Sequence, residues 1–281
     1  MNGGSPSYAM ARALHECCDA MPGVAPLDVL PLWAMFIGLF IANLLLDECG
    51  FRIGRLRERR GHKETDATVG TIVAAELGLL AFLLAFSFGI AASRFDLRRH
   101  MVLDEANAIG TSFLRAATIP DAQGASIRRL LRDYADVRLG ATAGVPVDRV
   151  LRRSEEIHQQ LWTQAAAAAQ QDPRSVPIGL LMQSLNEVID LHASRVLAAL
   201  RNRMPLPVWL VLFAVGFLSF FTIGYQAGLT RASRSPAAIV LALTLCTVIW
   251  LIADLDRSGE GFLRVSQEPM IEVRRMMSSA P

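Results

Sequence analysis

One carboxylate stands alone inside an otherwise uncharged apolar segment of this chain. Residues 69–92 carry no charge other than that of Glu76. An ionised carboxylate in the hydrocarbon layer costs at least ~2.5 kcal/mol unless it is paired, hydrated or protonated. Glu76 is therefore not expected to face lipid. Either it lines a pore or carries a proton, or it lies near the membrane interface and bonds to Thr71 or Asn43.

A stripe of small residues marks the same segment. Its members recur every three or four positions: Gly78, Ala81, Ala85 and Gly89. Small side chains let membrane helices approach closely, and this is the use that we expect for them. Beside them, Phe82, Phe86 and Ser87 would give a pore the mixed lining of an apolar constriction. If the chain forms a ring, both uses hold on different faces of one helix.

Two polar clusters lie outside the apolar segments. They are Asp104, Glu105 and Asn107, and Asn186, Glu187, Asp190 and His192. Carboxylates and a histidine on facing helices can bind a metal, which makes Glu187, Asp190 and His192 weak ligand candidates. However, a dinuclear site needs Glu-x-x-His on two helices, and the only acidic pair with i, i+3 spacing in these clusters is Glu187 with Asp190. We therefore expect an ion-pair network, with no metal or other cofactor. Its cationic partners would be Arg98, Arg115 and Arg195.

Enzymes and nucleic-acid-binding proteins are both disfavoured. No cluster supplies a nucleophile beside a base, and no glycine-rich phosphate loop is present, so we expect no enzymatic activity. The chain has 28 basic and 26 acidic residues, and this balance provides no basic surface for nucleic acid. The remaining histidines are expected to lie isolated on polar faces: His15, His62, His100 and His158.

Four apolar segments are long enough, at ~1.5 Å per helical residue, to cross a bilayer. They are Val29–Leu46, Val69–Ala92, Leu206–Leu229 and Pro236–Ala253. The sequence thus predicts an all-α membrane protein whose four transmembrane helices form two hairpins around an inserted helical bundle. The expected divisions are an N-terminal tail at 1–28, a hairpin at 29–93, the bundle at 94–205, a hairpin at 206–255 and a C-terminal tail at 256–281.

The bundle is predicted from heptad and helical spacing of apolar residues. Phe95, Val102, Ile109 and Phe113 continue the second span as one long helix until Pro120. Three further helices with one apolar stripe each are expected around 127–137, 148–168 and 178–203. Stripes of this kind meet in the core of a bundle.

Three segments resemble the bestrophin-like domain family of bacterial membrane proteins. They are ASRFDLRRHMVLDEANAIG (Ala92–Gly110), LNEVIDLHASRV (Leu185–Val196) and LDRSGEGFLRVSQEP (Leu255–Pro269). The resemblance covers roughly residues 60 to 272, with two spans, a helical insert and two more spans in the same order.

This resemblance implies a homo-oligomeric ion channel, by distant similarity to bestrophin anion channels, whose second span lines an axial pore. Bestrophins also bind Ca²⁺ through an acidic run after the last span. Here that place holds only Asp254, Asp256 and Glu260, which argues against calcium gating. The expected partners are the lipid bilayer, further copies of the chain and small ions, with no nucleic acid. The alternative is a membrane-anchored sensor or scaffold whose helical domain binds a partner and which transports nothing.

The basic residues favour one orientation in a bacterial cytoplasmic membrane. Both hairpin loops are rich in arginine, at 51–68 and 230–235, so the positive-inside rule makes them cytoplasmic. The helical domain would then lie on the outer face. Basic residues that flank the bundle oppose this assignment: Arg94, Arg98, Arg99, Arg195, Arg201 and Arg203.

Overall fold

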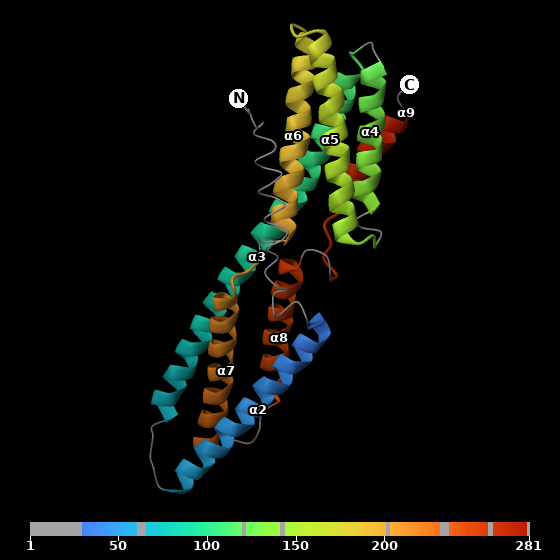
Figure 1. The fold of residues 1–281 in the computed structure, drawn as a ribbon. Helices are drawn as coiled ribbons and strands as arrows, with labels where there is room; N and C mark the ends of the chain where they lie inside the picture. Colours follow the sequence, from blue (N-terminus) through green and yellow to red (C-terminus); the bar gives the residue numbers. More distant parts are fainter. Residues whose placement is uncertain are drawn as a thin grey trace, which may run out of the picture. The chain divides into compact units, whose positions relative to one another are not determined.

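Every regular element in the described part of the chain is an α-helix (Figure 1). The computed structural model describes residues 30–60, 66–119, 122–140, 144–200, 203–230, 236–257 and 261–279. Its helices are α2 (Leu32–Arg59), α3 (Asp66–Ala116), α4 (Ala122–Gly140), α5 (Val147–Gln171), α6 (Val176–Leu200), α7 (Leu206–Leu229), α8 (Ala237–Asp256) and α9 (Glu268–Ser279). The predicted all-α class is confirmed.

The described residues form two compact units. The membrane unit contains those up to Phe95 and from Arg203 to Arg264, and the helical unit contains Asp96–Asn202 and those from Val265 onward. Helix α3 contributes to both units, as the uninterrupted heptad pattern predicted.

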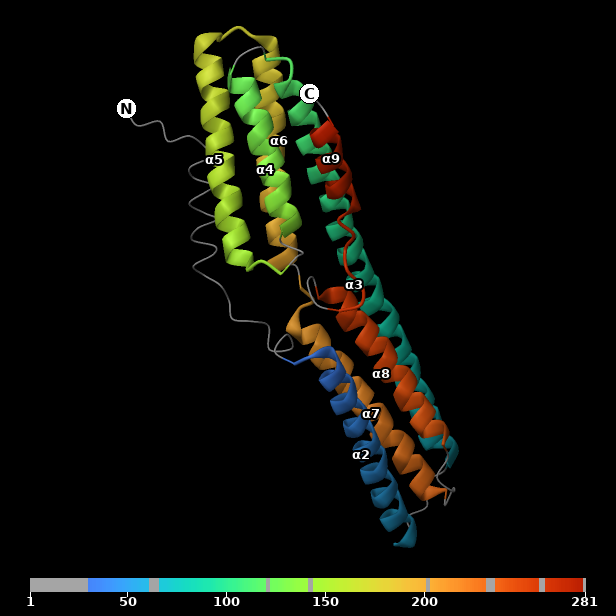
Figure 2. The same ribbon diagram turned by 90° about the vertical axis from the view of Figure 1, so that its right-hand side faces the viewer.

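Four helices have the length and apolar composition of membrane spans, as predicted: α2, α3, α7 and α8. Helices α2, α7 and α8 lie side by side in the membrane unit (Figure 2). The observed bounds of α7 are those expected from the sequence. Helix α2 is longer than expected, because it runs on to Arg59 through residues that the sequence placed in the hairpin loop.

Four glycines explain why α2 continues. A Cβ added at Gly50 or Gly54 would run into the backbone of α7, and one added at Gly224 or Gly228 would run into the backbone of α2. The two helices therefore touch backbone to backbone, which stabilises this part of α2 as a helix. Close packing through small residues is thus present between α2 and α7, whereas it was expected on the second span.

The helical unit is built around the predicted apolar stripes. Ile127, Leu131 and Tyr134 of α4 are fully buried, and the stripes of α5 and α6 are buried beside them. Helices α4, α5 and α6 lie side by side (Figures 1 and 2).

The end of the chain completes this core. Residues 256–281 were expected to form a C-terminal tail, whereas α9 within them belongs to the helical unit. Its Met270, Val273 and Met277 recur at helical spacing and are buried against α3 and α4, and Arg274 forms two hydrogen bonds to Asp136 at 2.6 and 2.9 Å. Burial of one apolar face therefore makes α9 part of the bundle.

Candidate functional site

One face of α3 in the membrane unit carries exposed aromatic residues. Phe82 is 65% exposed and Phe86 is 59% exposed, although both belong to a membrane span. Their rings stack one helical turn apart, with centroids at 6.4 Å and planes at 11°. Within the described chain this face is open, so either lipid or another copy of the protein covers it.

The small-residue stripe lies on the same side of α3. Its four members are all exposed: Gly78, Ala81, Ala85 and Gly89. A Cβ added at Gly78 or Gly89 would meet no described atom within 4 Å. The stripe therefore does not serve packing within the described part of this chain, and its predicted use in helix association can apply only between copies.

The other two residues proposed for a pore lie differently. Ser87 is 1% exposed, so it faces the interior of the membrane unit and lies away from Phe82 and Phe86. Glu76 is half-buried, and its Oε2 is buried without a hydrogen bond to any described residue. Neither residue belongs to the open aromatic face as the chain stands alone.

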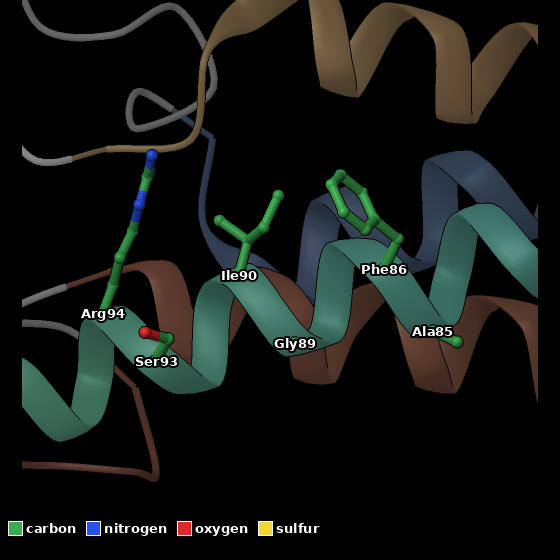
Figure 3. Close-up of a pocket in the computed structure, with 6 residues that line it drawn as sticks. All are labelled: Ala85, Phe86, Gly89, Ile90, Ser93 and Arg94. Carbon is green, nitrogen blue, oxygen red and sulfur yellow. The ribbon is translucent and has the colours of Figure 1, made fainter.

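A shallow hollow continues the open face past Phe86. It is lined by Ala85, Phe86, Gly89, Ile90, Ser93 and Arg94. Phe86, Ile90 and Arg94 project to the same side of α3 (Figure 3). Arg94 Nη1 lies 3.7 Å from Asp256 Oδ1, so the hollow ends at an ion pair.

The acidic residues at the end of α8 are occupied by backbone groups. Asp254 Oδ1 accepts the N–H of Phe262 at 2.9 Å, and its Oδ2 accepts the N–H of Leu263 at 3.0 Å. Asp256 accepts the N–H of Met204 at 3.0 and 3.2 Å. Gly261 has a φ of 128°, and a Cβ there would run into the Asp254 carboxylate. These carboxylates fix the ends of membrane helices.

A second polar site lies in the core of the helical unit. Glu105 of α3 is 0% exposed and receives three donors. Arg138 of α4 forms an ion pair with Glu105, with Nε 3.0 Å from Oε1, and it donates from Nη2 to Oε2 at 3.3 Å. The hydroxyl of Tyr134 donates to Oε1 at 2.5 Å, and Arg195 Nη1 of α6 donates to Oε2. Arg195 also donates to Gln267 Oε1 at 2.9 Å.

Two histidines extend this cluster. His192 Nδ1 of α6 lies 3.0 Å from the Tyr134 hydroxyl, and the ring of His158 on α5 packs 4.8 Å from the Tyr134 ring and 4.9 Å from the His192 ring. His158 is 7% exposed, and its Nε2 is buried with no hydrogen-bond partner among the described residues. We call Glu105, Tyr134, Arg138, His158, His192 and Arg195 the buried polar cluster.

Burial and charge shift the pKa values in this cluster. Burial alone would raise the pKa of Glu105, but the charges of Arg138 and Arg195 outweigh it and hold the pKa at about 2. Burial lowers the pKa of His158 to about 4 and, together with the neighbouring His158 and Arg138, lowers that of His192 to about 3. The carboxylate is therefore ionised at neutral pH, and both imidazoles are neutral.

The two polar clusters expected from the sequence meet only in part. Glu105, His192 and Arg195 come together, as the expected ion-pair network requires. Asp104, Asn107 and Glu187 are instead exposed. The exposed Asp190 accepts a hydrogen bond from Asn186 at 2.8 Å. No group of three or more metal-ligating side chains was found among the residues that the structure describes.

Sequence reasoning missed three members of the buried polar cluster. The expectation that His158 lies isolated on a polar face is wrong, because it is buried against Tyr134 and His192. Tyr134 was placed in the apolar stripe, and Arg138 was not singled out. Arg138 lies one turn after Tyr134, on the buried side of α4. A charged residue in register with an apolar stripe was the available signal.

The family model of the bestrophin-like domain matches residues 48–270. The chain belongs to the bestrophin-like domain family. The expectation of a bestrophin-like channel protein in a membrane is thereby confirmed at the level of family.

Solved structures of bacterial bestrophin homologues share the fold. A bestrophin homologue from Klebsiella pneumoniae is 16% identical, and the alignment covers 87% of this chain and 99% of that one with a TM-score of 0.61. A variant of the same homologue, in which one tyrosine is replaced by alanine, has the same identity and coverage, with a TM-score of 0.64. No curated protein matches the sequence.

The residues after the last span of this bestrophin-like protein do not fit a calcium site. Ca²⁺ takes six to eight oxygen ligands, chiefly carboxylates and carbonyls. All four carboxylate oxygens of Asp254 and Asp256 already accept backbone N–H groups. Glu260, the third acid at this place, lies outside the described residues. The carboxylates of Asp254 and Asp256 bind backbone groups of the membrane unit, and the expectation against calcium gating stays a prediction.

Proposed function

We propose that this bestrophin-like protein is an ion channel formed by several copies of the chain, in which the open face of α3 lines the conduction path. The observation that carries the proposal is the exposure of Phe82 and Phe86 on the same side as Gly78 and Gly89. In a closed ring each copy presents the same surface to the axis. The repeated phenylalanines then form an apolar constriction, which blocks ions by excluding water.

The charges along α3 bear on the ions that pass. Arg94 ends the hollow beside Phe86, and its positive charge, which Asp256 offsets in part, favours anions at that end of the path. Glu76 would disfavour anions if it faced the path, and its half-buried position reduces that effect. We therefore propose a path for small anions. Charge-neutralising changes at Arg94 and Glu76 should shift the reversal potential in opposite directions.

Ion flux into liposomes that contain the purified protein tests the proposal. Phe86→Ala should raise the flux above wild type at equal protein amounts, because a smaller apolar side chain widens and wets the constriction. Phe88→Ala is the matched control, since Phe88 is also 40% exposed but points about 200° around the helix from Phe86. It should leave the flux unchanged.

Two outcomes would contradict the proposal. If the folded, oligomeric wild type and Phe86→Ala both give no flux above empty liposomes, then nothing is conducted along this face, and the sensor or scaffold becomes the better interpretation. If Phe88→Ala raises flux as much as Phe86→Ala, then the constriction lies on another face of α3.

We further propose that the protein lies in a bacterial cytoplasmic membrane with its hairpin ends in the cytoplasm and its helical unit outside. Arg57 and Arg59 form the last turn of α2, next to the loop that joins it to α3. Basic residues are retained on the cytoplasmic side of bacterial membranes. Their density at this end of the membrane unit supports the orientation.

A further inference from the structure

The buried polar cluster joins four helices of the helical unit by contacts that depend on protonation. Glu105 comes from α3, Tyr134 and Arg138 come from α4, His158 comes from α5, and His192 and Arg195 come from α6. All six side chains are at least mostly buried, so water cannot compensate a change of charge among them.

The hydrogen bonds fix how protons are distributed in this cluster. An ionised carboxylate only accepts, so the single proton of the Tyr134 hydroxyl is donated to Glu105. The Tyr134 oxygen must then accept from His192, whose Nδ1 therefore carries the imidazole proton. A further proton on His192 can be added only at Nε2, and it converts a neutral ring into a cation.

A proton added to His158 or His192 brings a positive charge into a core that already holds more cations than anions. The groups that face the two histidines are Glu105 from α3, Tyr134 and Arg138 from α4, and Arg195 from α6. Gln267, which precedes α9 and holds Arg195, is uncharged, and Arg98 is a further buried cation two turns before Glu105 on α3. One carboxylate thus faces two arginines before any histidine is charged. The two imidazole rings also touch, so protonating both places like charges together.

We propose that the buried polar cluster is an acid-operated latch, in which proton uptake by His158 and His192 loosens the packing of α5 and α6 on α3 and α4. At neutral pH the cluster is closed by the Glu105, Tyr134 and His192 hydrogen bonds. The unpartnered Nε2 of His158 leaves one proton site ready in the core. The latch acts within the helical unit and does not depend on conduction.

The pH range of opening follows from linkage. Both histidines have pKa values in the closed unit, about 4 and about 3, below the ordinary value of 6.5. The open state therefore binds more protons, and falling pH favours it once the pH is below about 6.5. Between about 6.5 and 5.5, Glu105 is almost fully ionised in both states, since its pKa is about 2 when closed and 4.5 when free. The histidines alone drive opening in this range.

Hydrogen exchange of the full-length protein in detergent tests the latch. After correction for the intrinsic pH dependence of exchange, opening of peptides from α5 and α6 should increase by up to about tenfold per histidine for each pH unit below about 6. Peptides from α7 should show no such increase, because that helix belongs to the membrane unit.

Neutral side chains at the two histidines should remove the effect. In His158→Gln with His192→Gln, protection of α5 and α6 should stay constant between pH 6.5 and 5.5. His100→Gln is the control, since His100 is exposed on α3 and paired only with Asp96 at 3.5 Å, and it should open as the wild type does. If the double variant does not fold, each single variant should show about half of the wild-type slope, which is the change in the logarithm of α5 and α6 opening per pH unit.

Three results would overturn the latch. One is a wild type whose α5 and α6 keep constant protection down to pH 4.5. Another is a folded double or single variant with the slope of the wild type. The third is loss of protection in α7 at the same pH as in α5 and α6, which would mean general acid unfolding rather than a local opening.

Discussion

At the scale of single residues, the helical unit depends on one carboxylate. Glu105 balances Arg138 and Arg195 and also orients Tyr134, which in turn receives His192. A buried ion pair of this kind adds little net stability compared with apolar packing. Removal of one partner is different, because it leaves the opposite charges buried without compensation.

Glu105→Gln should therefore destabilise the helical unit by about 3 to 5 kcal/mol, because two arginines lose their counter-charge. The unfolding temperature followed by circular dichroism should fall by roughly 6 to 20 °C. Asp104→Asn changes a neighbouring but exposed carboxylate and should alter stability by less than about 0.5 kcal/mol. Equal unfolding temperatures for Glu105→Gln and wild type would show that the ion pairs do not hold the unit together.

The cluster shows how far sequence reasoning reaches at this scale. Glu105, His192 and Arg195 could be predicted as partners because they belong to groups of polar residues on helices that were expected to face each other. Tyr134 and His158 could not be predicted as members of the cluster. Tyr134 lies in an apolar stripe and is typical of a packing residue, whereas His158 lies beside a stripe and is typical of a surface residue. Such a side chain forms a hydrogen bond in the core only if the facing helix places a polar group opposite it. The periodicity of a single helix does not show which residues of another helix lie opposite.

At the scale of elements, the length of α2 depends on its contact with α7. The spans were predictable from their apolar length alone, but the continuation of α2 to Arg59 was not. Its last turns are polar and contain Gly50 and Gly54, and polar residues with glycines are typical of a loop. Spacing by four recurs at Gly224 and Gly228 of α7, and this matching pair was the signal for a close helix crossing.

Gly50→Ala should weaken the α2–α7 crossing, because its Cβ would run into the backbone oxygen of Phe221. Overpacking of this kind costs about 1 to 3 kcal/mol. Gly38→Ala is the matched control on the same helix, since a Cβ there meets no described atom within 4 Å, and it should be neutral or stabilising by up to about 1 kcal/mol. Thermal unfolding of the two variants in the same detergent separates them. A Gly50→Ala protein as stable as Gly38→Ala would contradict the close crossing.

At the scale of the whole molecule, the open face of α3 is the surface on which the proposed ring depends. Within the described chain nothing covers Phe82, Phe86 or the space at Gly89. Burial was predictable for stripes that meet inside one chain, as in α4 to α6. The stripe on α3 had the same appearance in the sequence, yet no described element of its own chain meets it. In the membrane, either lipid or a second copy covers such a surface, and the proposed ring assigns it to the second copy.

Gly89→Leu should disrupt the oligomer and leave the single chain folded, because leucine fits the open space in one copy but blocks approach by another. Native mass measurement in mild detergent should show a smaller assembly than the wild type. Gly38→Leu fills a comparably open position on α2 and should leave the assembly unchanged. A wild-type protein that is monomeric both in detergent and in nanodiscs would contradict the proposed ring of several copies.

The orientation of the molecule can be tested by placing one cysteine in each unit. In a chain whose native cysteines are replaced by alanine, Thr230→Cys marks the exposed end of α7, and Val176→Cys marks a position that is 70% exposed at the start of α6. The arginines at the end of α2 resist transfer across the membrane, so this end should stay in the cytoplasm. An impermeant thiol reagent should therefore label Val176→Cys in intact cells and Thr230→Cys only after the membrane is opened. Labelling of Thr230→Cys alone in intact cells would reverse the orientation and would turn the buried polar cluster toward the cytoplasm, where its latch would respond to internal rather than external acid.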